Sequence, residues 1–368
     1  MKSSRKSQSF SDSRRAAFQT GLLAWYDAHA RDLPWREDRD PYRVWLSEIM
    51  LQQTRVAAVI AHYHEFLRRF PTVQKLAAAR EASVLAAWSG LGYYRRARML
   101  HAAAKVVVRK RGGKFPTTAS ELLELPGVGR YTAAAIASIA FGEPVAVVDG
   151  NVERVLQRVS GRRLVGEKLW DAAETLLDRN GPGDFNQAMM ELGATVCMPR
   201  SPACLTCPVV ELCATRGELA GATKASPQKK LEIHFALDLR DDDGCGGKVF
   251  LVQRPWDASL MAGMWELPDV ASRARRPKKQ QVPLAGFASP RNDMIRGNGG
   301  DRRTRSEPCL TLRHSITVTD YTVRVWCMHT SSRSTGKWFP VERLSHVALT
   351  GLARKVLQKA GILAAPGR

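Results

Sequence analysis

The sequence lacks a long hydrophobic run. Its longest mainly apolar stretch is about nine residues, over 133–141, whereas a helix needs roughly 20 apolar residues to cross a bilayer. The basic, polar start of the chain is not followed by the apolar segment of a secretory signal. We therefore expect no membrane-spanning helix and no secretion, and we favour a bacterial cytoplasm, with a nucleus or mitochondrion as the alternatives.

Acidic residues are scarce: 35 Asp and Glu stand against 56 Lys and Arg, which gives a formal net charge of +21. The excess is concentrated, because residues 51–130 hold 14 Lys and Arg against 4 Asp and Glu, and residues 271–305 hold 10 against 2. Such concentration is typical of polyanion binders, since neutralised phosphates release condensed counterions. The charge favours a nucleic acid as the partner, while a solubilising surface or an anionic membrane surface remain open alternatives.

A length of 368 residues suggests two or three domains. Apolar residues recur at helical spacing through the first half, including a helical stretch over 42–70, whereas strand-like alternation begins after residue 230. We expect a mainly α N-terminal region and a smaller α+β C-terminal domain. The expected segments are a basic disordered tail (1–15), the helical region (16–220), a linker (221–230) and the α+β domain (231–364), which contains a basic loop (271–308).

Four of the seven cysteines lie within 17 residues. They are Cys197, Cys204, Cys207 and Cys213. Four thiolates bind either structural zinc or an iron–sulfur cluster, and the spacing favours a [4Fe–4S] cluster because only the middle two cysteines form a close pair. Without a secretion signal a disulfide framework is not expected. The other three cysteines are interpreted as ordinary core or surface residues: Cys245, Cys309 and Cys327.

A Leu-Pro-Gly-Val-Gly segment over 125–129 separates two helical stretches. Gly127 and Gly129 permit a tight turn that leaves backbone N–H groups and a helix N-terminus facing outward. Such a nest binds phosphate without reading the base sequence. The segment therefore indicates a helix-hairpin-helix that contacts DNA, and an ordinary glycine-rich turn between helices is the alternative.

Two carboxyl groups have the surroundings expected of catalytic residues. Glu48 lies among apolar residues of the predicted 42–70 helix, and burial raises the pKa of a carboxyl so that it holds a proton near neutral pH. Asp149 ends an apolar segment just before another helix. The two would serve as an acid and as a group that stabilises positive charge on a sugar. The alternatives are a solvated helix face for Glu48 and a helix cap for Asp149.

Together these segments resemble the MutY family of adenine DNA glycosylases, which belongs to the endonuclease III superfamily. The resemblance covers roughly residues 18–215 and continues into the C-terminal domain. The matching segments are LPWR (33–36), SEIMLQQT (47–54), GLGYY (90–94), LPGVGRYTA (125–133), VVDGN (147–151), FNQAMMELGA (185–194), the four clustered cysteines, QRP (253–255) and LMAGMWELP (260–268).

The resemblance implies excision of adenine mispaired with 8-oxoguanine or guanine in double-stranded DNA by a monomeric enzyme, after the base has left the duplex. It implies that Glu48 protonates adenine N7 and helps to activate water. Asp149 would stabilise the oxocarbenium ion or capture it transiently. Tyr131 and Asn151 would position these carboxylates, and Arg36 would line the pocket. Bifunctional members carry a Lys that forms a Schiff base with the sugar at the position of Tyr131, so lyase activity is not expected.

Further residues follow from the same resemblance. Gln53 and Tyr93 match residues that wedge into the base stack, and the four clustered cysteines match the ligands of a [4Fe–4S] cluster. The C-terminal domain resembles a Nudix fold, yet it has too few acidic residues after Pro268 for a pyrophosphohydrolase metal site. We interpret it as a lesion-recognition module, in which His314 matches a loop histidine and Arg313 replaces the family's serine.

Two other functions remain as alternatives. One is a bifunctional glycosylase and abasic-site lyase similar to endonuclease III, which the tyrosine at position 131 disfavours. The other is a non-enzymatic DNA-binding protein with a structural metal, for which the clustered cysteines and the basic charge would suffice.

Overall fold

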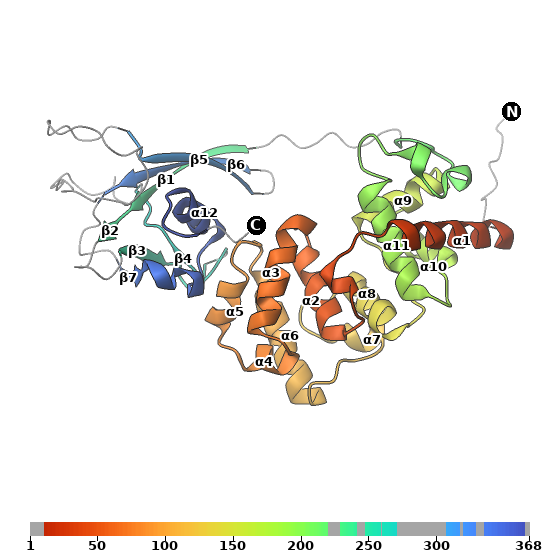
Figure 1. Cartoon of the computed structure of the whole chain (residues 1–368), viewed down its shortest axis with the longest axis horizontal. Coiled ribbons are helices and arrows are strands. Elements are labelled where there is room, and N and C mark those ends of the chain that lie inside the picture. Colours follow the sequence, from red (N-terminus) through yellow and green to blue (C-terminus); the bar gives the residue numbers. More distant parts are fainter. Residues whose placement is uncertain are drawn as a thin grey trace. The chain divides into compact units, whose positions relative to one another are not determined.

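The computed structural model describes residues 11–219, 229–240, 247–258, 260–270, 307–316, 319–328 and 335–364. The chain forms two compact units (Figure 1). The first comprises Met1–Ala78 and Met99–Thr223, and the second comprises Ala79–Arg98 and Lys224–Arg368. The short segment 79–98 therefore packs with C-terminal residues, although it lies inside the helical region in the sequence.

Several expected segments lie partly or wholly outside the described residues. These are residues 1–10 of the basic tail, 221–228 of the linker and 271–306 of the basic loop. Residues 12–15, which the sequence assigned to the tail, form the first turn of a helix. None of the described helices combines the length and the apolar character that crossing a membrane requires.

The first unit is helical, as the sequence predicted. Its elements are α1 (Asp12–His29), η1 (Pro34–Arg36), α2 (Pro41–Leu51), α3 (Val56–Arg69), α4 (Val73–Ala78), most of α6 (Arg95–Arg111), α7 (Ala119–Leu122), α8 (Arg130–Phe141), α9 (Gly150–Ser160), α10 (Glu167–Leu176), α11 (Pro182–Thr195), η2 (Cys204–Thr206) and η3 (Val210–Leu212). The expected helix over 42–70 is two helices, because residues 52–55 interrupt it and Gln53 adopts a left-handed φ of 56°. This break places Gln53 at the surface directly after α2.

Close helix packing fixes the centre of the first unit. A Cβ added at Gly183 on α11 would lie 2.7 Å from the carbonyl oxygen of Ser138 on α8, so α11 and α8 approach each other through small residues. Asn186 of α11 then donates a hydrogen bond of 2.9 Å to the Ser138 hydroxyl and accepts one of 3.1 Å from the backbone of Val147. These contacts hold in place the segment that leads to Asp149.

The described part of the second unit contains two small sheets together with short helices. Its elements are α5 (Glu81–Ala87), the start of α6, β1 (Lys229–Leu237), β2 (Leu239–Arg240), β3 (Lys248–Gln253), β4 (Trp265–Glu266), β5 (Leu310–Ile316), β6 (Thr319–Cys327), β7 (Gly336–Pro340), η5 (Val341–His346) and α12 (Gly351–Lys359). In one sheet the order is β1-β6-β5, with β1 and β6 parallel and β5 and β6 antiparallel. In the other, β3 pairs with β2, β4 and β7.

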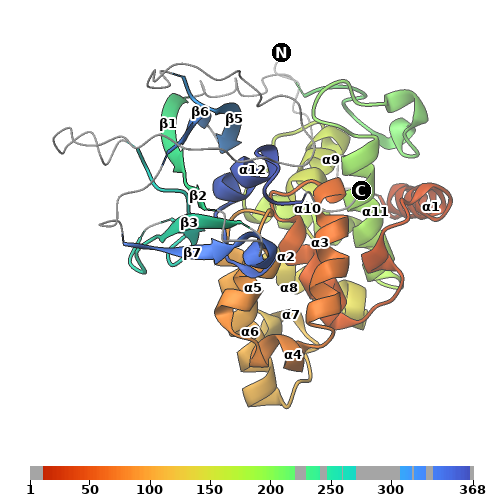
Figure 2. The ribbon, with the colours of Figure 1, turned by 60° about the vertical axis from the view of Figure 1, so that its left-hand side comes forward.

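One core joins both sheets of the second unit. Figures 1 and 2 both show α12 beside the two sheets, and its buried residues Leu352, Val356 and Leu357 share a hydrophobic cluster with Val249 of β3 and Val323 of β6. The predicted α+β architecture of the C-terminal region is confirmed, as is the helical architecture before it.

Candidate active site and cysteine cluster

Glu48 and Tyr131 form a buried pair between α2 and α8. Glu48 is 6% exposed, and the hydroxyl of Tyr131 donates a hydrogen bond to its Oε2 atom. Burial raises the pKa of Glu48 to about 7; the hydrogen bond from Tyr131 and the charge of Arg36 oppose this shift, and the charge of Asp149 adds to it. Glu48 is thus a carboxyl that exchanges its proton near neutral pH.

Asp149 is the N-cap of α9, and each of its carboxylate oxygens accepts hydrogen bonds. Its Oδ1 accepts from the backbone N–H groups of Asn151 at 2.8 Å and Val152 at 2.7 Å, and its Oδ2 accepts from the side-chain amide of Asn151 at 2.9 Å. Asp149 is therefore a helix cap, which was the alternative interpretation of this residue. Its charge also contributes to raising the pKa of both Glu48 and Tyr131. The helix N-terminus holds this carboxylate in one orientation.

Arg36 is held by an acidic residue to which the sequence analysis gave no role. Glu191 on α11 is 1% exposed; it accepts hydrogen bonds of 2.8 Å from Arg36 and of 2.6 and 2.8 Å from Arg31. Burial alone would raise the pKa of Glu191, but the hydrogen bonds and charges of both arginines lower it below its usual value. Arg36 also lies over the ring of Tyr26, 5.4 Å from its centroid.

A signal for Glu191 was present in the sequence. It is an acidic residue at helical spacing among apolar neighbours, as Glu48 is, and such a residue needs a partner when it is buried. Its partners Arg36 and Arg31, however, lie 155 and 160 positions earlier in the chain, so the sequence could not identify them.

Gln53 and Tyr93 share an uncommon backbone conformation. Their φ angles are 56° and 47°, which non-glycine residues rarely adopt, and both side chains are exposed, Tyr93 to 45%. Gln53 belongs to the first unit and Tyr93 to the second. Strained residues of this kind often mark functional sites.

The predicted hairpin lies between α7 and α8. Gly127 has a φ of 76°, and a Cβ at this position would lie 2.4 Å from Cβ of Met99, so both the conformation and the packing require glycine. Gly129 is the N-cap of α8 and supplies no side-chain oxygen, which leaves the first N–H groups of α8 available to a phosphate. The side chain of Arg130 lies 3.9 Å from the centroid of the Trp170 ring.

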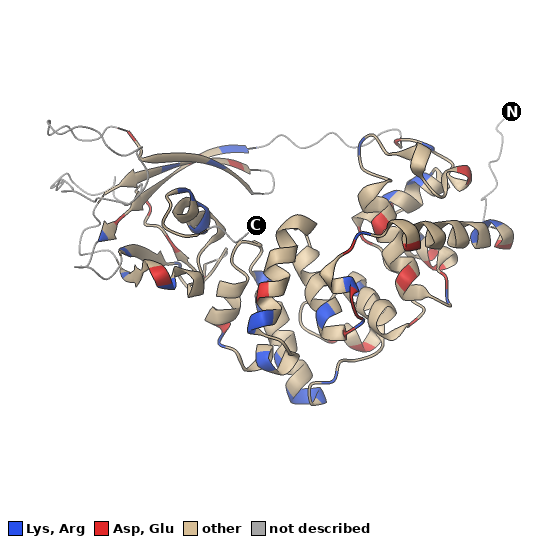
Figure 3. Cartoon of the chain, in the orientation of Figure 1, with Lys and Arg blue, Asp and Glu red and all other residues tan. Residues whose placement is uncertain are grey.

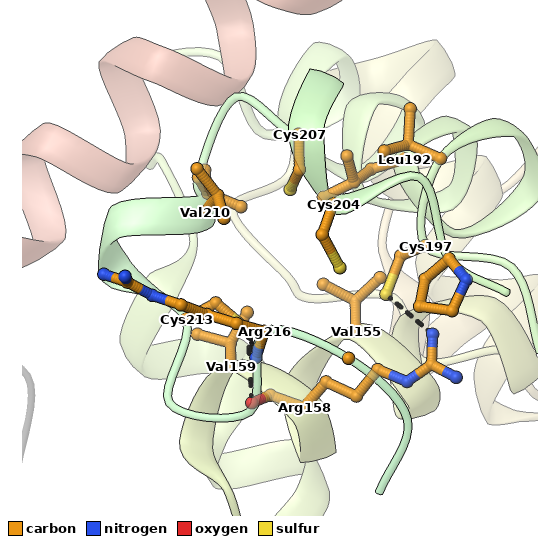
Figure 4. A pocket seen from close by; sticks show the side chains of 14 residues that line it. Val155, Arg158, Val159, Leu192, Cys197, Cys204, Cys207, Val210, Cys213 and Arg216 are labelled. Carbon is orange, nitrogen blue, oxygen red and sulfur yellow. Dashed lines mark hydrogen bonds between the residues drawn. The ribbon is translucent and has the colours of Figure 1, made fainter.

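The four clustered cysteines line one pocket (Figure 4). All four have free thiols, and Figure 4 shows the sulfurs of Cys197, Cys204 and Cys207 directed into the pocket. Burial raises the pKa of Cys207 to about 11, with smaller contributions from the other three cysteines. Four unbridged thiols that line one pocket are the donor type of a tetrathiolate metal group, so the chemistry of these residues fits the expected cofactor. Among the described residues, however, no three Cys, His, Asp or Glu side chains are already close enough to hold a metal ion together.

Two arginines of α9 contact the segment that carries Cys197. Arg158 donates hydrogen bonds to the sulfur of Cys197 at 3.3 Å and to the carbonyl of Met198 at 2.7 Å. Arg154 donates to the carbonyl of Cys197 at 2.7 Å and to the side-chain oxygen of Asn151 at 2.8 Å. A chain of hydrogen bonds thus runs from Asp149 through Asn151 and Arg154 to the first cysteine of the cluster.

Arg313 and His314 lie within β5 instead of the expected loop. His314 is half-buried, and burial, with the charge of Lys355, lowers its pKa below the usual value. Lys355 of α12 donates a hydrogen bond of 2.6 Å to the carbonyl of Arg313. The strand forms because Leu310, Leu312 and His314 alternate toward the same face, and His314 pairs with Tyr321 of β6.

Two cysteines that were interpreted as ordinary residues are paired. Cys309 and Cys327 form a disulfide, with their Cα atoms 5.9 Å apart. They lie at adjacent ends of the antiparallel strands β5 and β6, and this neighbourhood follows from strand register, which the spacing in the sequence did not indicate. Cys245 lies outside the described residues.

The hairpin and the carboxylates beside it define a class of protein. Residues 46–170 match the family model of the HhH-GPD superfamily of base excision DNA repair proteins. A solved thermostable thymine-DNA glycosylase superposes with a TM-score of 0.53 at 33% identity, over 56% of this chain and 97% of that one.

Relatives that match about two thirds of this chain narrow the class of protein. The chain is 43% identical to the human adenine DNA glycosylase over 314 residues, which cover 69% of this chain and 57% of the human protein. It is 32% identical to the adenine DNA glycosylase of Schizosaccharomyces pombe over 69% of each chain. The chain belongs to the adenine DNA glycosylase family. It spans 57% of the length of the human relative and 60% of that of the mouse relative.

Proposed function

We propose that this protein is a monofunctional adenine DNA glycosylase of base excision repair, which removes adenine mispaired with 8-oxoguanine or guanine. The observation that carries this proposal is the buried Glu48, with a pKa of about 7, bonded to Tyr131 and close to the capped carboxylate of Asp149. Family membership supports the same activity, because relatives such as the rat protein, 46% identical over 281 residues, are adenine DNA glycosylases.

In this proposal the protonated carboxyl of Glu48 donates its proton to N7 of the flipped adenine. The N-glycosidic bond breaks as its electron pair moves onto the base, and the sugar becomes an oxocarbenium ion. Asp149, fixed in one orientation by the N-terminus of α9, stabilises this cation. Water then adds to the sugar and loses a proton to the Glu48 carboxylate, which leaves an abasic site and free adenine.

The absence of strand cleavage follows from the residue beside the hairpin. Tyr131 occupies the second position of α8, and its phenol has no amine with which to form a Schiff base. Its hydroxyl instead donates to Glu48. The proposal is therefore a hydrolase that leaves the DNA backbone intact.

We infer that the four clustered cysteines hold a [4Fe–4S] cluster. Their free thiols, which line one pocket, support this cofactor. The favoured role is structural, since Arg158 and Arg154 bind the Cys197 segment to α9. Iron and sulfide analysis of purified protein tests the inference. Stoichiometric zinc in colourless protein would contradict it.

Double-stranded DNA is the proposed partner. The outward N-terminus of α8 and the basic last turn of α6, with Arg109, Lys110 and Arg111, support phosphate binding, and Figure 3 shows basic residues along α6. In the second unit His314 and Arg313 are the proposed contacts to the lesion. The monomeric state and the cytoplasmic location expected from the sequence stay predictions.

The experiment that tests this function measures base release from a panel of duplexes. We expect adenine release opposite 8-oxoguanine and guanine, and no covalent adduct after borohydride treatment. Thymine release from a T:G duplex would instead favour a thymine-DNA glycosylase activity, as named for the solved structural relative. A trapped adduct would favour the bifunctional lyase.

A further inference from the structure

The exposed ring of Tyr93 stands at the end of a turn that glycines alone do not stabilise. Gly90, Gly92 and Tyr93 all have positive φ angles, of 115°, 70° and 47°. Glycine adopts such angles readily, but tyrosine does so only when its surroundings impose them. The turn therefore needs external contacts to keep Tyr93 in this conformation.

Arg96 supplies several of these contacts. Its Nη2 atom donates hydrogen bonds to the carbonyls of Leu91 at 2.9 Å and Gly92 at 3.3 Å. Its guanidinium lies 5.4 Å from the centroid of the Trp88 ring and 5.7 Å from that of Tyr93. One side chain thus binds the backbone of the turn and both aromatic rings that flank it.

Trp88 and the C-terminal residues of the same unit hold the rest of the turn. The indole N–H of Trp88 donates to the carbonyl of Gly92 at 3.2 Å. The hydroxyls of Ser89 and Tyr94 both donate to the carbonyl of Leu349, at 3.0 and 2.8 Å. Both ends of the turn are therefore held by hydrogen bonds, in addition to those that Arg96 donates to its carbonyls.

The environment of Arg96 does not favour a role as a DNA phosphate ligand. Burial lowers its pKa to about 10, and the charge of Tyr93 opposes this shift. A partly buried guanidinium whose Nη2 atom already donates to two carbonyls is a poor phosphate ligand, whereas the neighbouring Arg95 is exposed. The two arginines, adjacent in the chain, have different tasks.

We propose that Arg96 is a positioning residue that sets the orientation of Tyr93 before DNA binds. The inference rests on the proposed function, in which Tyr93 inserts beside the mispair. A ring held ready in its inserted orientation loses less conformational freedom on binding. Arg96 thereby contributes to base flipping without touching DNA.

The first test uses the DNA-free enzyme and does not depend on activity. Hydrogen exchange is measured in the peptide covering residues 88–94 for the wild type, Arg96→Met and Arg96→Lys, with Arg95→Met as the control for loss of one charge. We expect faster exchange in both Arg96 variants and wild-type exchange in the control. Unchanged exchange in Arg96→Met would overturn the proposal. If Arg96→Met does not fold, the result for Arg96→Lys decides whether the proposal holds. This variant keeps the positive charge but lacks the several N–H donors of the guanidinium.

The second test is a double-mutant cycle on a duplex with adenine opposite 8-oxoguanine. Arg96→Met is expected to slow single-turnover excision on the order of tenfold in the wild-type background and to have little effect when Tyr93 is already alanine. An equal slowing in both backgrounds would show that Arg96 acts independently of Tyr93, which contradicts the proposal. Wild-type enzyme that releases no adenine would refute the proposed function instead, and the exchange experiment would still decide the role of Arg96.

Discussion

The hydroxyl of Tyr131 donates a hydrogen bond to Oε2 of Glu48, a residue 83 positions earlier in the chain. This bond opposes the effect of burial on Glu48, since it favours the ionised carboxylate. The balance leaves the pKa of Glu48 at about 7, where the group can give up and recover a proton within one catalytic cycle.

The first prediction concerns the dependence of activity on pH. If protonated Glu48 is the acid, excision slows as the pH rises through about 7, because the proton is lost there. Substitution Glu48→Asp, which keeps a carboxyl but moves it, should lower the rate yet retain a falling alkaline limb. Single-turnover rates between pH 5 and 9 measure this. A rate that does not fall above pH 7 would show that another group donates the proton.

Glu48 should also make stability depend on pH. Its pKa in the folded protein lies above its value in the unfolded chain, so the folded state binds the proton more tightly. Stability from this group is complete below about pH 4.5 and is lost as the pH rises through about 7. Glu48→Gln should therefore gain up to about 3 kcal/mol relative to the wild type between pH 5 and 8. Urea unfolding of both proteins at pH 5 and pH 8 measures this difference. If the free energies of unfolding of the wild type and Glu48→Gln changed equally between the two pH values, the prediction would be wrong.

Tyr131→Phe should move the alkaline limb of the rate profile to higher pH. The substitution removes the hydrogen bond that lowers the pKa of Glu48, so the carboxyl holds its proton longer. Tyr42→Phe is a matched control, because Tyr42 donates to the carbonyl of Phe70 at 2.7 Å and makes no hydrogen bond to the carboxylates. The control should lose stability without a shift of the limb, and a downward shift in Tyr131→Phe would refute the explanation.

Asp149→Asn should separate the two tasks of this residue. An asparagine still caps α9 through its oxygen, so we expect a loss of stability of no more than about 1 kcal/mol. Without the negative charge, excision should slow on the order of a hundredfold or more. Ser11→Ala is the control for losing a helix cap. The hydroxyl of Ser11 accepts a hydrogen bond from the backbone N–H of Arg14 and caps α1, and the substitution removes it. If Asp149→Asn and Ser11→Ala changed the excision rate equally, Asp149 would act only as a helix cap, which would contradict its proposed role at the sugar.

How far the sequence predicts this site depends on whether the relevant contact is local. Glu48 is recognisable because its apolar neighbours lie on the same helix, and Asp149 because it immediately precedes one. The partner of Glu48 is 83 positions away and those of Glu191 about 155, so their pairing depends on how α2, α8 and α11 pack. For Asp149 the sequence left two interpretations open, and the structure shows the helix cap. Its role in stabilising a positive charge stays a prediction.

The C-terminal half shows the same limit. Alternating residues predict strands there, but they do not specify which strands pair. The β5–β6 register brings Cys309 to Cys327 and places His314 in a strand. Likewise, nothing in residues 79–98 predicts that Tyr94 donates to the carbonyl of Leu349, 255 positions later. These contacts make the segment part of the second unit.

The measurement that tests the central claim most directly is single-turnover release of adenine from a duplex with adenine opposite 8-oxoguanine, by wild-type protein and by Glu48→Gln. The account predicts release by the wild type with the DNA backbone intact, and a rate lower on the order of a thousandfold for Glu48→Gln. Iron content and thermal unfolding establish that both proteins are folded. Wild-type release that Glu48→Gln matches, or no release by wild type with its full iron content, would contradict the account.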